Sequence, residues 1–390
     1  MKSIYYTQNM KKGYSLMNKG IFRSVHIADL HFGAFNPKLQ YDLLKEQFLN
    51  ILTNPTFPDI DLISINGDIF DHKLMGNSDS IYYASVFIDE LVKIARMKKC
   101  TLLLIHGTYS HDADQLKLFY HYMDDATVDV RVVTQIQFEQ VKNCRVLCIP
   151  ELYGISDEFY DEVLHKSGYY DLAVIHGTFE GSVYGNNSGN AKLFNIHDFN
   201  MCTGMMVGGH VHHPGCFSGY FYYCGCPYRW KFGEEEEKGF LFCMQDLDNN
   251  FHDVYFQKII SKTYITVELK DIISQDPQKV ISYIDDMKRT KGIDYLKIKF
   301  KYPVDGANKV IINNYYRNSN STFVEFLNIM EEQKAKAEAN GETSLEESEY
   351  AFIFDDKLSD LEKFVMYCNL QEGEEFISID KLKEILSEDI

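Results

Sequence analysis

Short apolar runs alternate with amphipathic segments over the larger, N-terminal part of the chain, and this alternation constrains the fold most. The runs at 22–29, 61–66 and 101–106 have the length and composition of buried strands, whereas 37–54 and about 78–98 have helical periodicity. Further strands are expected at 145–149, 171–175, 205–209, 217–224 and 239–244. This order predicts a layered α/β fold, with functional loops at the carboxyl ends of the strands.

The pattern restarts beyond about residue 260. A strand is expected at 262–269, a helix at 276–289, a strand at 294–302, and helical material from about Ser321. These elements predict a second, smaller α/β domain. The expected organisation is a leader at 1–20, a chemical domain at 21–260, a second domain at 261–335, and an acidic linker with C-terminal helices at 336–390.

The leader is expected to be disordered, because the first strand-like run starts only at Ile21. Two short amphipathic helices are expected near the C-terminus, at about 356–370 and 379–388. They either pack onto the second domain or dock to a helix of a partner protein.

The charge of the chain limits what it can bind by itself. Its 390 residues have a formal net charge of −18, and residues 331–390 carry 18 acidic against 6 basic side chains. An acidic chain does not attract a phosphodiester backbone by bulk electrostatics, so local basic groups, metal ions or a partner must do so. No P-loop motif is present, so any ATP dependence must come from a partner.

The remaining composition favours a cytoplasmic protein. No apolar run is long enough to span a bilayer, so no membrane association is expected, and the N-terminus lacks the apolar core of a secretory signal. The nine cysteines are spread along the chain, with one close pair, Cys224 and Cys226. Free buried thiols in a reducing compartment are the preferred interpretation.

Polar residues gather where the predicted strands end. All 13 histidines lie between His26 and His252. The residues directly after successive strands are Asp29 and His31, then Asp68, then Ser110 and His111, then His176, and finally His210 and His212. Each motif alone is weak, but five in succession, each after its own strand, indicate a metal centre.

The spacing within these motifs favours chelation. Residues two apart on an extended strand end face the same side, so D-x-H and H-x-H are natural chelating pairs. Imidazole and carboxylate together suit Mn²⁺, Fe²⁺ or Zn²⁺. Two carboxylates and four imidazoles exceed what one ion needs and fit two ions sharing a carboxylate, roughly 3.5–4 Å apart.

Other conspicuous residues are given structural roles. His26 lies within the first strand and is expected to be a core or hydrogen-bonded histidine, and His106 a strand-end residue. His213 is expected to point away from the H-x-H pair. The four glutamates at 234–237 are interpreted as a solvated turn, and Trp230 as a packing residue.

The ordered motifs resemble the calcineurin-like metallophosphoesterases, and in detail the SbcD-type exonuclease branch. The similarity rests on "IADLHFG", "GDIFD", "GGHVHHP" and "YCGCPYRWKFGEEEEKGF", and it extends over 21–260. It implies a two-layered sheet sandwich flanked by helices, with 261–335 in the place of the family's capping domain.

The resemblance also implies roles for individual residues. Asp29, His31 and His212 would hold one ion, and His176 and His210 the other, with Asp68 bridging them. The family's G-N-H-D loop reads G-T-Y-S-H-D here, which places Ser110 in the slot of the asparagine ligand, binding weakly or through water. His111 would stabilise the transition state or act as general acid. A further catalytic position of this branch falls on Asp71 or His72.

The activity implied is a Mn²⁺-dependent DNA exonuclease and endonuclease using two ions. Such a subunit acts with an SbcC-like SMC-family ATPase in double-strand-break processing, and forms a homodimer. A stand-alone phosphoesterase acting on nucleotides or phosphoproteins is the alternative. A scaffold that has lost catalysis is a third hypothesis, because the loop at 107–112 is altered.

Overall fold

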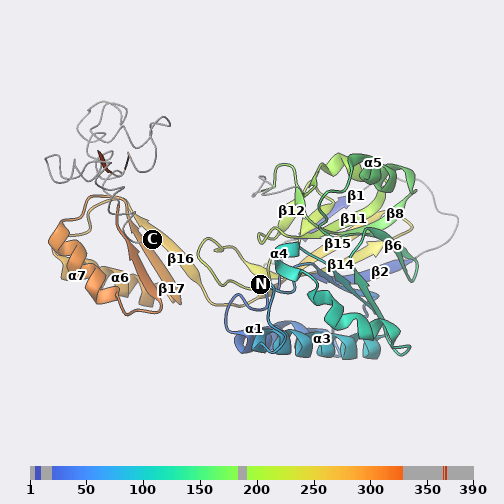
Figure 1. Cartoon of the computed structure of the whole chain (residues 1–390), viewed down its shortest axis with the longest axis horizontal. Helices are drawn as coiled ribbons and strands as arrows, with labels where there is room; N and C mark the ends of the chain where they lie inside the picture. Colours follow the sequence, from blue (N-terminus) through green and yellow to red (C-terminus); the bar gives the residue numbers. More distant parts are fainter. Residues whose placement is uncertain (1–4, 10–19, 183–190, 328–362, 364, 367–390) are drawn as a thin grey trace, which may run out of the picture. The chain divides into compact units, whose positions relative to one another are not determined.

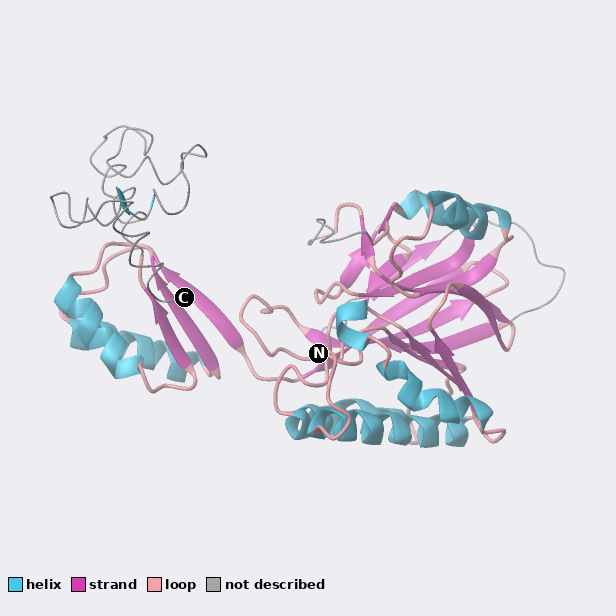
Figure 2. Ribbon diagram, viewed as in Figure 1, coloured by secondary structure: helices cyan, strands magenta, loops and turns pink. Residues whose placement is uncertain are grey.

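The computed structural model describes residues 5–9, 20–182, 191–327, 363 and 365–366 (Figure 1). The chain divides into two compact units, residues 1–264 and 265–390. The α/β prediction is confirmed, since mixed sheets are flanked by helices (Figure 2).

The first sheet of the N-terminal unit has seven strands. Their order is β1 (Tyr5–Asn9), β15 (Phe251–Ile259), β14 (Lys238–Asp246), β2 (Ile21–Ile27), β3 (Leu62–Asn66), β4 (Thr101–Ile105) and β5 (Asp129–Val133). Strands β2 to β5 are parallel, and the other pairs are antiparallel. Strand β1 lies within the predicted leader, so the expectation that strands begin only at Ile21 is wrong. It pairs with β15, which the sequence reading also missed.

The second sheet has six strands. Their order is β12 (Gly215–Phe217), β13 (Phe221–Tyr223), β11 (Cys202–Gly209), β8 (Tyr170–His176), β7 (Cys144–Ile149) and β6 (Gln137–Val141). The four central strands are parallel, and each edge strand is antiparallel to its neighbour. The single strand predicted at 217–224 is wrong, because Ser218 and Gly219 have φ of 72° and 86° and turn the chain into a hairpin.

The two sheets pack face to face. Neighbouring residues of one strand point to opposite faces. Leu62 and Leu103 of the first sheet therefore share a core with Val174 and Val207 of the second, whereas Ile63 lies on the outer face of the first sheet. Cores on both faces of each sheet explain why the strands read as continuous apolar runs.

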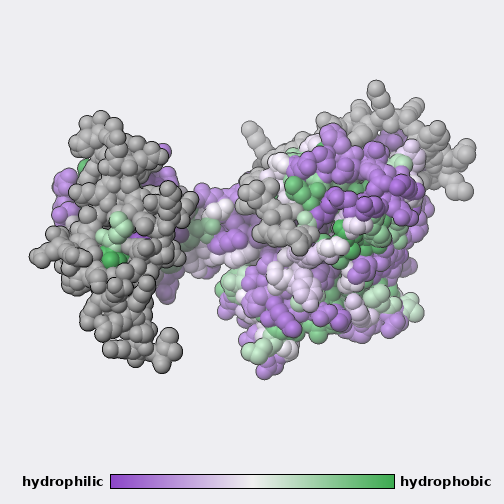
Figure 3. Space-filling view, turned by 45° about the horizontal axis from the view of Figure 1, so that its top comes forward, coloured by the Kyte–Doolittle hydropathy of each residue, from purple (hydrophilic) through white to green (hydrophobic). Residues whose placement is uncertain are grey.

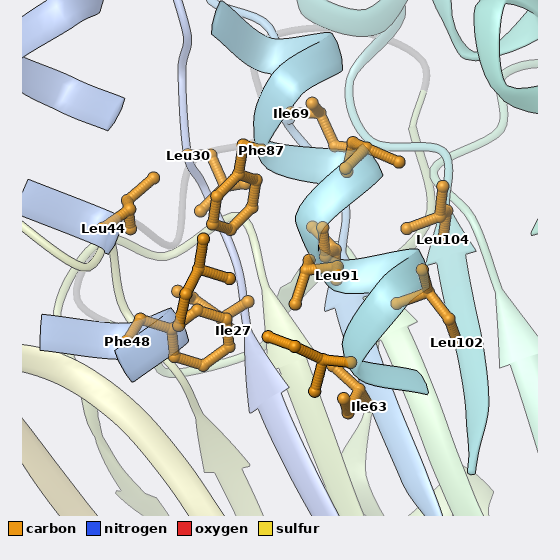
Figure 4. Packing of buried hydrophobic residues seen from close by; sticks show 14 of the residues in the cluster. Ile27, Leu30, Leu44, Phe48, Ile63, Ile69, Phe87, Leu91, Leu102 and Leu104 are labelled. Carbon is orange, nitrogen blue, oxygen red and sulfur yellow. The ribbon is translucent and has the colours of Figure 1, made fainter. Parts of the chain in front are cut away.

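Helices cover the outer faces of both sheets. Helices α1 (Pro37–Leu44) and α3 (Asp79–Lys98) lie on the first sheet, where Phe87 and Leu91 of α3 pack on Ile27 and Ile63 (Figure 4). Helix α5 (Asp157–Asp161) lies on the second sheet. Burying one large apolar side chain, such as Phe87 or Leu91, contributes roughly 1.5–3 kcal/mol.

The remaining short elements of the N-terminal unit are helical turns and one pair of short strands. They are the π-helical turns Lys45–Leu49 and Glu162–Lys166, the 3₁₀ segments Gln115–Asp124 and Ile196–Phe199, α2 (Asn50–Thr53), α4 (Tyr109–Asp112), and the pair β9 (Thr178–Phe179) and β10 (Leu193–Phe194).

The C-terminal unit has its own sheet and core. Its strands are β16 (Tyr264–Leu269), β17 (Tyr295–Phe300) and β18 (Thr322–Glu325), with helices α6 (Pro277–Lys291) and α7 (Gly306–Tyr316). Ile284, Leu296 and Ile312 are in the buried core. The helix expected from about Ser321 is wrong, because a strand follows there. The helices expected at 356–370 and 379–388 lie outside the described residues, apart from 363, 365 and 366.

Within the described ranges, no helix combines the length and the apolar character needed to cross a membrane. The face of the N-terminal unit seen in Figure 3 is largely hydrophilic, with smaller hydrophobic areas.

Candidate metal centre

The predicted site residues lie where the parallel strands of both sheets end. Asp29 follows β2 and Asp68 follows β3, while His176 ends β8 and His210 follows β11. At this edge the sheets approach so closely that a side chain on Gly209 would lie 2.1 Å from the carbonyl oxygen of Asn66. The sandwich therefore brings donors from both sheets together.

One group of donors consists of Asp29, His31 and His212. One ligand atom of each lies within 4.8 Å of the others. The Nε2 atoms of His31 and His212 are 3.1 Å apart, and both carboxylate oxygens of Asp29 accept from the backbone N–H of His210. Asp29 and His31 are buried, so this group is shielded from bulk water.

A second group consists of Asp68, His176 and His210, again with ligand atoms within 4.8 Å of one another. Oδ2 of Asp68 is 3.4 Å from Nε2 of His176 and 3.8 Å from Nε2 of His31. One carboxylate oxygen therefore lies between the two groups.

The carboxylates make the centre favourable for positive charge. Burial alone would lower the pKa of His176, but Asp68 outweighs it and raises that pKa to about 10. Burial would also lower the pKa of His31, but Asp71 and Asp68 outweigh this effect, so the pKa of His31 is raised. Burial would raise the pKa of Asp68, yet His176 holds it well below the usual range. The same field that favours protonated imidazoles favours bound cations.

Four of the predicted ligands have left-handed backbone conformations. The φ angles are 54° at Asp29, 46° at His31, 52° at Asp68 and 86° at His210. Such angles are uncommon outside glycine, cost free energy, and cluster at functional sites. Their coincidence with the donors is independent support for a functional centre.

Glycines allow the loops to approach the donors. A Cβ on Gly67 would lie 2.1 Å from Nδ1 of His176, and a Cβ on Gly107 would lie 2.2 Å from the backbone nitrogen of Asp68. Both separations are far below van der Waals contact, so these positions require glycine.

Protein oxygens fix the orientation of the imidazoles. Nδ1 of His176 lies 2.7 Å from the carbonyl oxygen of Asn66, and Nδ1 of His212 lies 2.8 Å from Glu234. Nδ1 of His31 lies 3.4 Å from Asp71. In all three residues Nε2 is left directed at the other donors, and the hydrogen bonds of His176 and His212 are the usual support for metal-binding histidines. The donor set and its support fit divalent ions of the Mn²⁺, Fe²⁺ and Zn²⁺ type.

The interpretation of 234–237 as a solvated turn is wrong for Glu234. Its side chain is 2% exposed, because it pairs with His212 behind the centre. Cys226 lies within reach of both, but burial raises the pKa of its thiol and its Sγ donates to the carbonyl oxygen of Tyr228. We therefore assign Glu234 the role of orienting His212.

His111 lies beside the first donor group. Its ring is 4.7 Å from that of His31, and its Nδ1 contacts the carbonyl oxygen of Asp71. Because a carbonyl only accepts, Nδ1 carries the hydrogen.

Asp71 and His72, the two candidates for the further catalytic position, differ clearly. Asp71 contacts His31, and mainly that histidine lowers the pKa of Asp71 to about 2. The side chain of His72, in contrast, is 57% exposed. The structure thus brings Asp71, but not His72, to the donors.

Ser110 does not lie where the resemblance to the phosphoesterases placed it. It is an exposed residue of α4, and Thr108 takes the inner position instead. The backbone N–H of Thr108 donates to Asp68 at 2.6 Å, and its Oγ1 lies 3.3 Å from Oδ2 of the same residue. With two more residues than the family's motif, the loop coils into α4 (Tyr109–Asp112), which carries Ser110 outward.

Glu151 is a member of the centre that the sequence reading missed. It is buried, and its Oε2 is 3.0 Å from Nδ1 of His210 and 3.8 Å from Nε2 of His176. The sequence held a signal for it, because Glu151 follows the predicted strand at 145–149 as the other donors follow their strands.

The structural roles given to other residues are confirmed for two of them. His26 is buried between the hydroxyls of Ser24 and Ser64, at 2.8 and 2.6 Å. Both ring nitrogens of His106 contact backbone carbonyl oxygens. His213 lies 3.8 Å from Glu236. The ring of Trp230 packs at 5.1 Å from those of His31 and His212, which limits their motion.

No protein-family model and no curated protein matches this chain. Among solved structures, 26 chains match. One of these, a crystal structure, is 10% identical, with a TM-score of 0.37 over 61% of this chain and 99% of that chain. A likeness this low carries no argument about fold or function, so the inferences below rest on the centre itself.

Proposed function

We propose that this chain is a two-metal phosphodiesterase of the calcineurin-like type, and specifically an SbcD-like DNA exonuclease and endonuclease subunit. The observation that carries the proposal is the pair of donor groups with one oxygen of Asp68 between them. Shared carboxylates hold paired ions close enough to act on one phosphate. The C-terminal unit would serve as the capping domain.

Asp29, His31 and His212 would hold one ion, and His176 and His210 the other, with Asp68 shared. Two divalent ions, Mn²⁺ in our proposal, supply charge neutralisation and a lowered pKa for water. His111 stands at the rim of the first group with its Nδ1 hydrogen-bonded to a carbonyl. Its Nε2 would contact the scissile phosphate or deliver a proton to the leaving oxygen.

The proposed substrate is DNA, and the proposed partner is an SbcC-like ATPase. A net charge of −18 opposes unaided binding of a duplex. A partner that grips DNA would share this task, and a homodimer would present two centres.

The test is hydrolysis by the purified protein with Mn²⁺ on linear duplex DNA, single-stranded DNA and a phosphomonoester. We expect cleavage of DNA, and a loss of about 100-fold or more in His111→Ala. The matched control is His197→Ala, an exposed histidine, which should retain full activity.

Cleavage of the phosphomonoester alone would replace the nuclease with a stand-alone phosphoesterase. Tight Mn²⁺ binding without cleavage of any substrate would support a non-catalytic scaffold.

A further inference from the structure

We propose that Glu151 is a direct ligand of the second ion, supplying the oxygen that an asparagine supplies in the family the chain resembles. This inference rests on the two-ion centre proposed above and adds a donor to it. It also changes the charge of that centre.

The geometry converges on one point. Oγ1 of Thr108 lies 3.3 Å from Oδ2 of Asp68 and 3.3 Å from Oε2 of Glu151. The same oxygen lies 3.4 Å from Nε2 of His176 and 3.4 Å from Nδ1 of His210. Four donor atoms, from Asp68, Glu151, His176 and His210, thus lie around the hydroxyl of Thr108, so all four belong to one small region beside the second donor group.

Glu151 is held so that one oxygen faces the two histidines of the second group. The hydroxyl of Tyr153 donates to Oε1 at 2.5 Å, which leaves Oε2 directed at the histidines. The glutamate side chain is 7% exposed, whereas that of His210 is 31% exposed. A buried carboxylate without a cation nearby is costly, and the neighbours that offset the cost here are the two histidines of the second group and the hydroxyl of Tyr153.

Thr108 cannot replace the asparagine by itself. It directly follows Gly107, as the asparagine does in G-N-H-D, but its hydroxyl is a neutral, weak ligand. Carboxylate oxygen suits Mn²⁺ and harder cations. With Asp68 and Glu151 both present, the second ion would have two anionic ligands rather than one, which strengthens its binding.

The experiment counts bound ions rather than turnover. Native mass spectrometry and Mn²⁺ titration would be applied to the full chain, to Glu151→Gln and to Glu158→Gln, the same substitution at an exposed position of α5. Electron paramagnetic resonance of the Mn²⁺ forms separates a spin-coupled pair from a single ion. Circular dichroism and thermal unfolding report whether each variant is folded.

We expect two ions and a coupled spectrum in the parent chain and in Glu158→Gln. Glu151→Gln should keep the first ion and bind the second at least about 100-fold more weakly, beyond the loss for a supporting partner. Tyr153→Phe, which frees Oε1, should give a smaller loss, with Glu151 still present.

Two ions bound by Glu151→Gln with the affinity of the parent would overturn the role of Glu151 and leave the proposed function standing. A parent chain that binds no Mn²⁺ would overturn the proposed function itself.

Discussion

In His176 and His212, the hydrogen bond on one ring nitrogen decides which nitrogen is offered to the centre. The carbonyl oxygen of Asn66 can only accept, so Nδ1 of His176 carries the hydrogen and Nε2 has the free lone pair. Glu234 imposes the same tautomer on His212. Residues that bind nothing themselves therefore set the ligand geometry.

Glu234→Gln tests this support. Glutamine can still accept from Nδ1 of His212 but without charge, and its amide can also turn its donor toward the ring. We expect affinity for Mn²⁺ to fall by about 10–100-fold, measured by calorimetric titration. Glu237→Gln is the control, because that carboxylate pairs with Lys258 at the surface. Equal affinities in both variants would contradict the role of Glu234.

His26 predicts a pH dependence of stability. Burial lowers its pKa from 6.5 to about 3, although a hydrogen bond with Asn66 opposes the shift. The folded state thus holds the neutral form, so its contribution is complete above pH 6.5 and is lost as the pH falls toward 3. We expect the difference in free energy of unfolding between the parent and His26→Gln to shrink by about 1.4 kcal/mol for each pH unit below 6.5. Urea unfolding at several pH values measures this, and parallel curves would refute it.

The loops after β3 and β4 are held together as one support. The carboxylate of Asp112 accepts from the backbone N–H groups of Gly107 at 2.8 Å, Asp68 at 3.1 Å and Phe70 at 3.1 Å. Burial, together with the neighbouring Asp68, raises the pKa of Asp112 to about 6. The position of the shared ligand therefore depends on the close approach of both loops.

Gly107→Ala should break this approach. The added Cβ would meet the backbone nitrogen and Oδ1 of Asp68 at 2.2 Å, so Asp68 must move. We expect a loss of about 2 kcal/mol in stability and a fall of at least about 10-fold in Mn²⁺ affinity. Gly76→Ala is the control, since its Cβ would meet nothing within 4 Å. Unchanged Mn²⁺ binding in Gly107→Ala would show that the loops can separate freely.

The sequence predicted the parts of the centre that depend on strand ends. Asp29, Asp68 and His176 lie together because parallel strands end at one edge, which periodicity alone can indicate. The contact of Thr108 with Asp68 was not predictable in this way. It depends on the lengthened loop after β4 coiling into α4. Glu151 could have been found by inspecting the end of every predicted strand.

Elements with weak patterns were missed for related reasons. Strand β18 and helix α7 belong to the small C-terminal unit, where both elements are partly exposed and their apolar periodicity is short. Strand β1 is a strand because β15 pairs with it, and that partner lies more than two hundred residues away in the chain. Long-range pairing of this kind leaves no local signal.

At the scale of the molecule, every proposed ligand belongs to the first of the two units. The cores around both sheets are formed by residues 22–259, and the core of the C-terminal unit by residues 269–316. All 13 histidines belong to the first unit. Each unit thus has a hydrophobic core of its own, as a domain does.

A chain ending at Tyr264 should therefore keep the centre. We expect it to bind as many Mn²⁺ ions as the full chain and to hydrolyse bis(p-nitrophenyl) phosphate at a similar rate, because every proposed ligand is retained. Native mass spectrometry and a colorimetric assay measure the two quantities. Cleavage of DNA should fall more than that of the small ester if the second unit helps to hold the substrate. Loss of bound ions in a folded truncated chain would show instead that the C-terminal unit contributes to the centre.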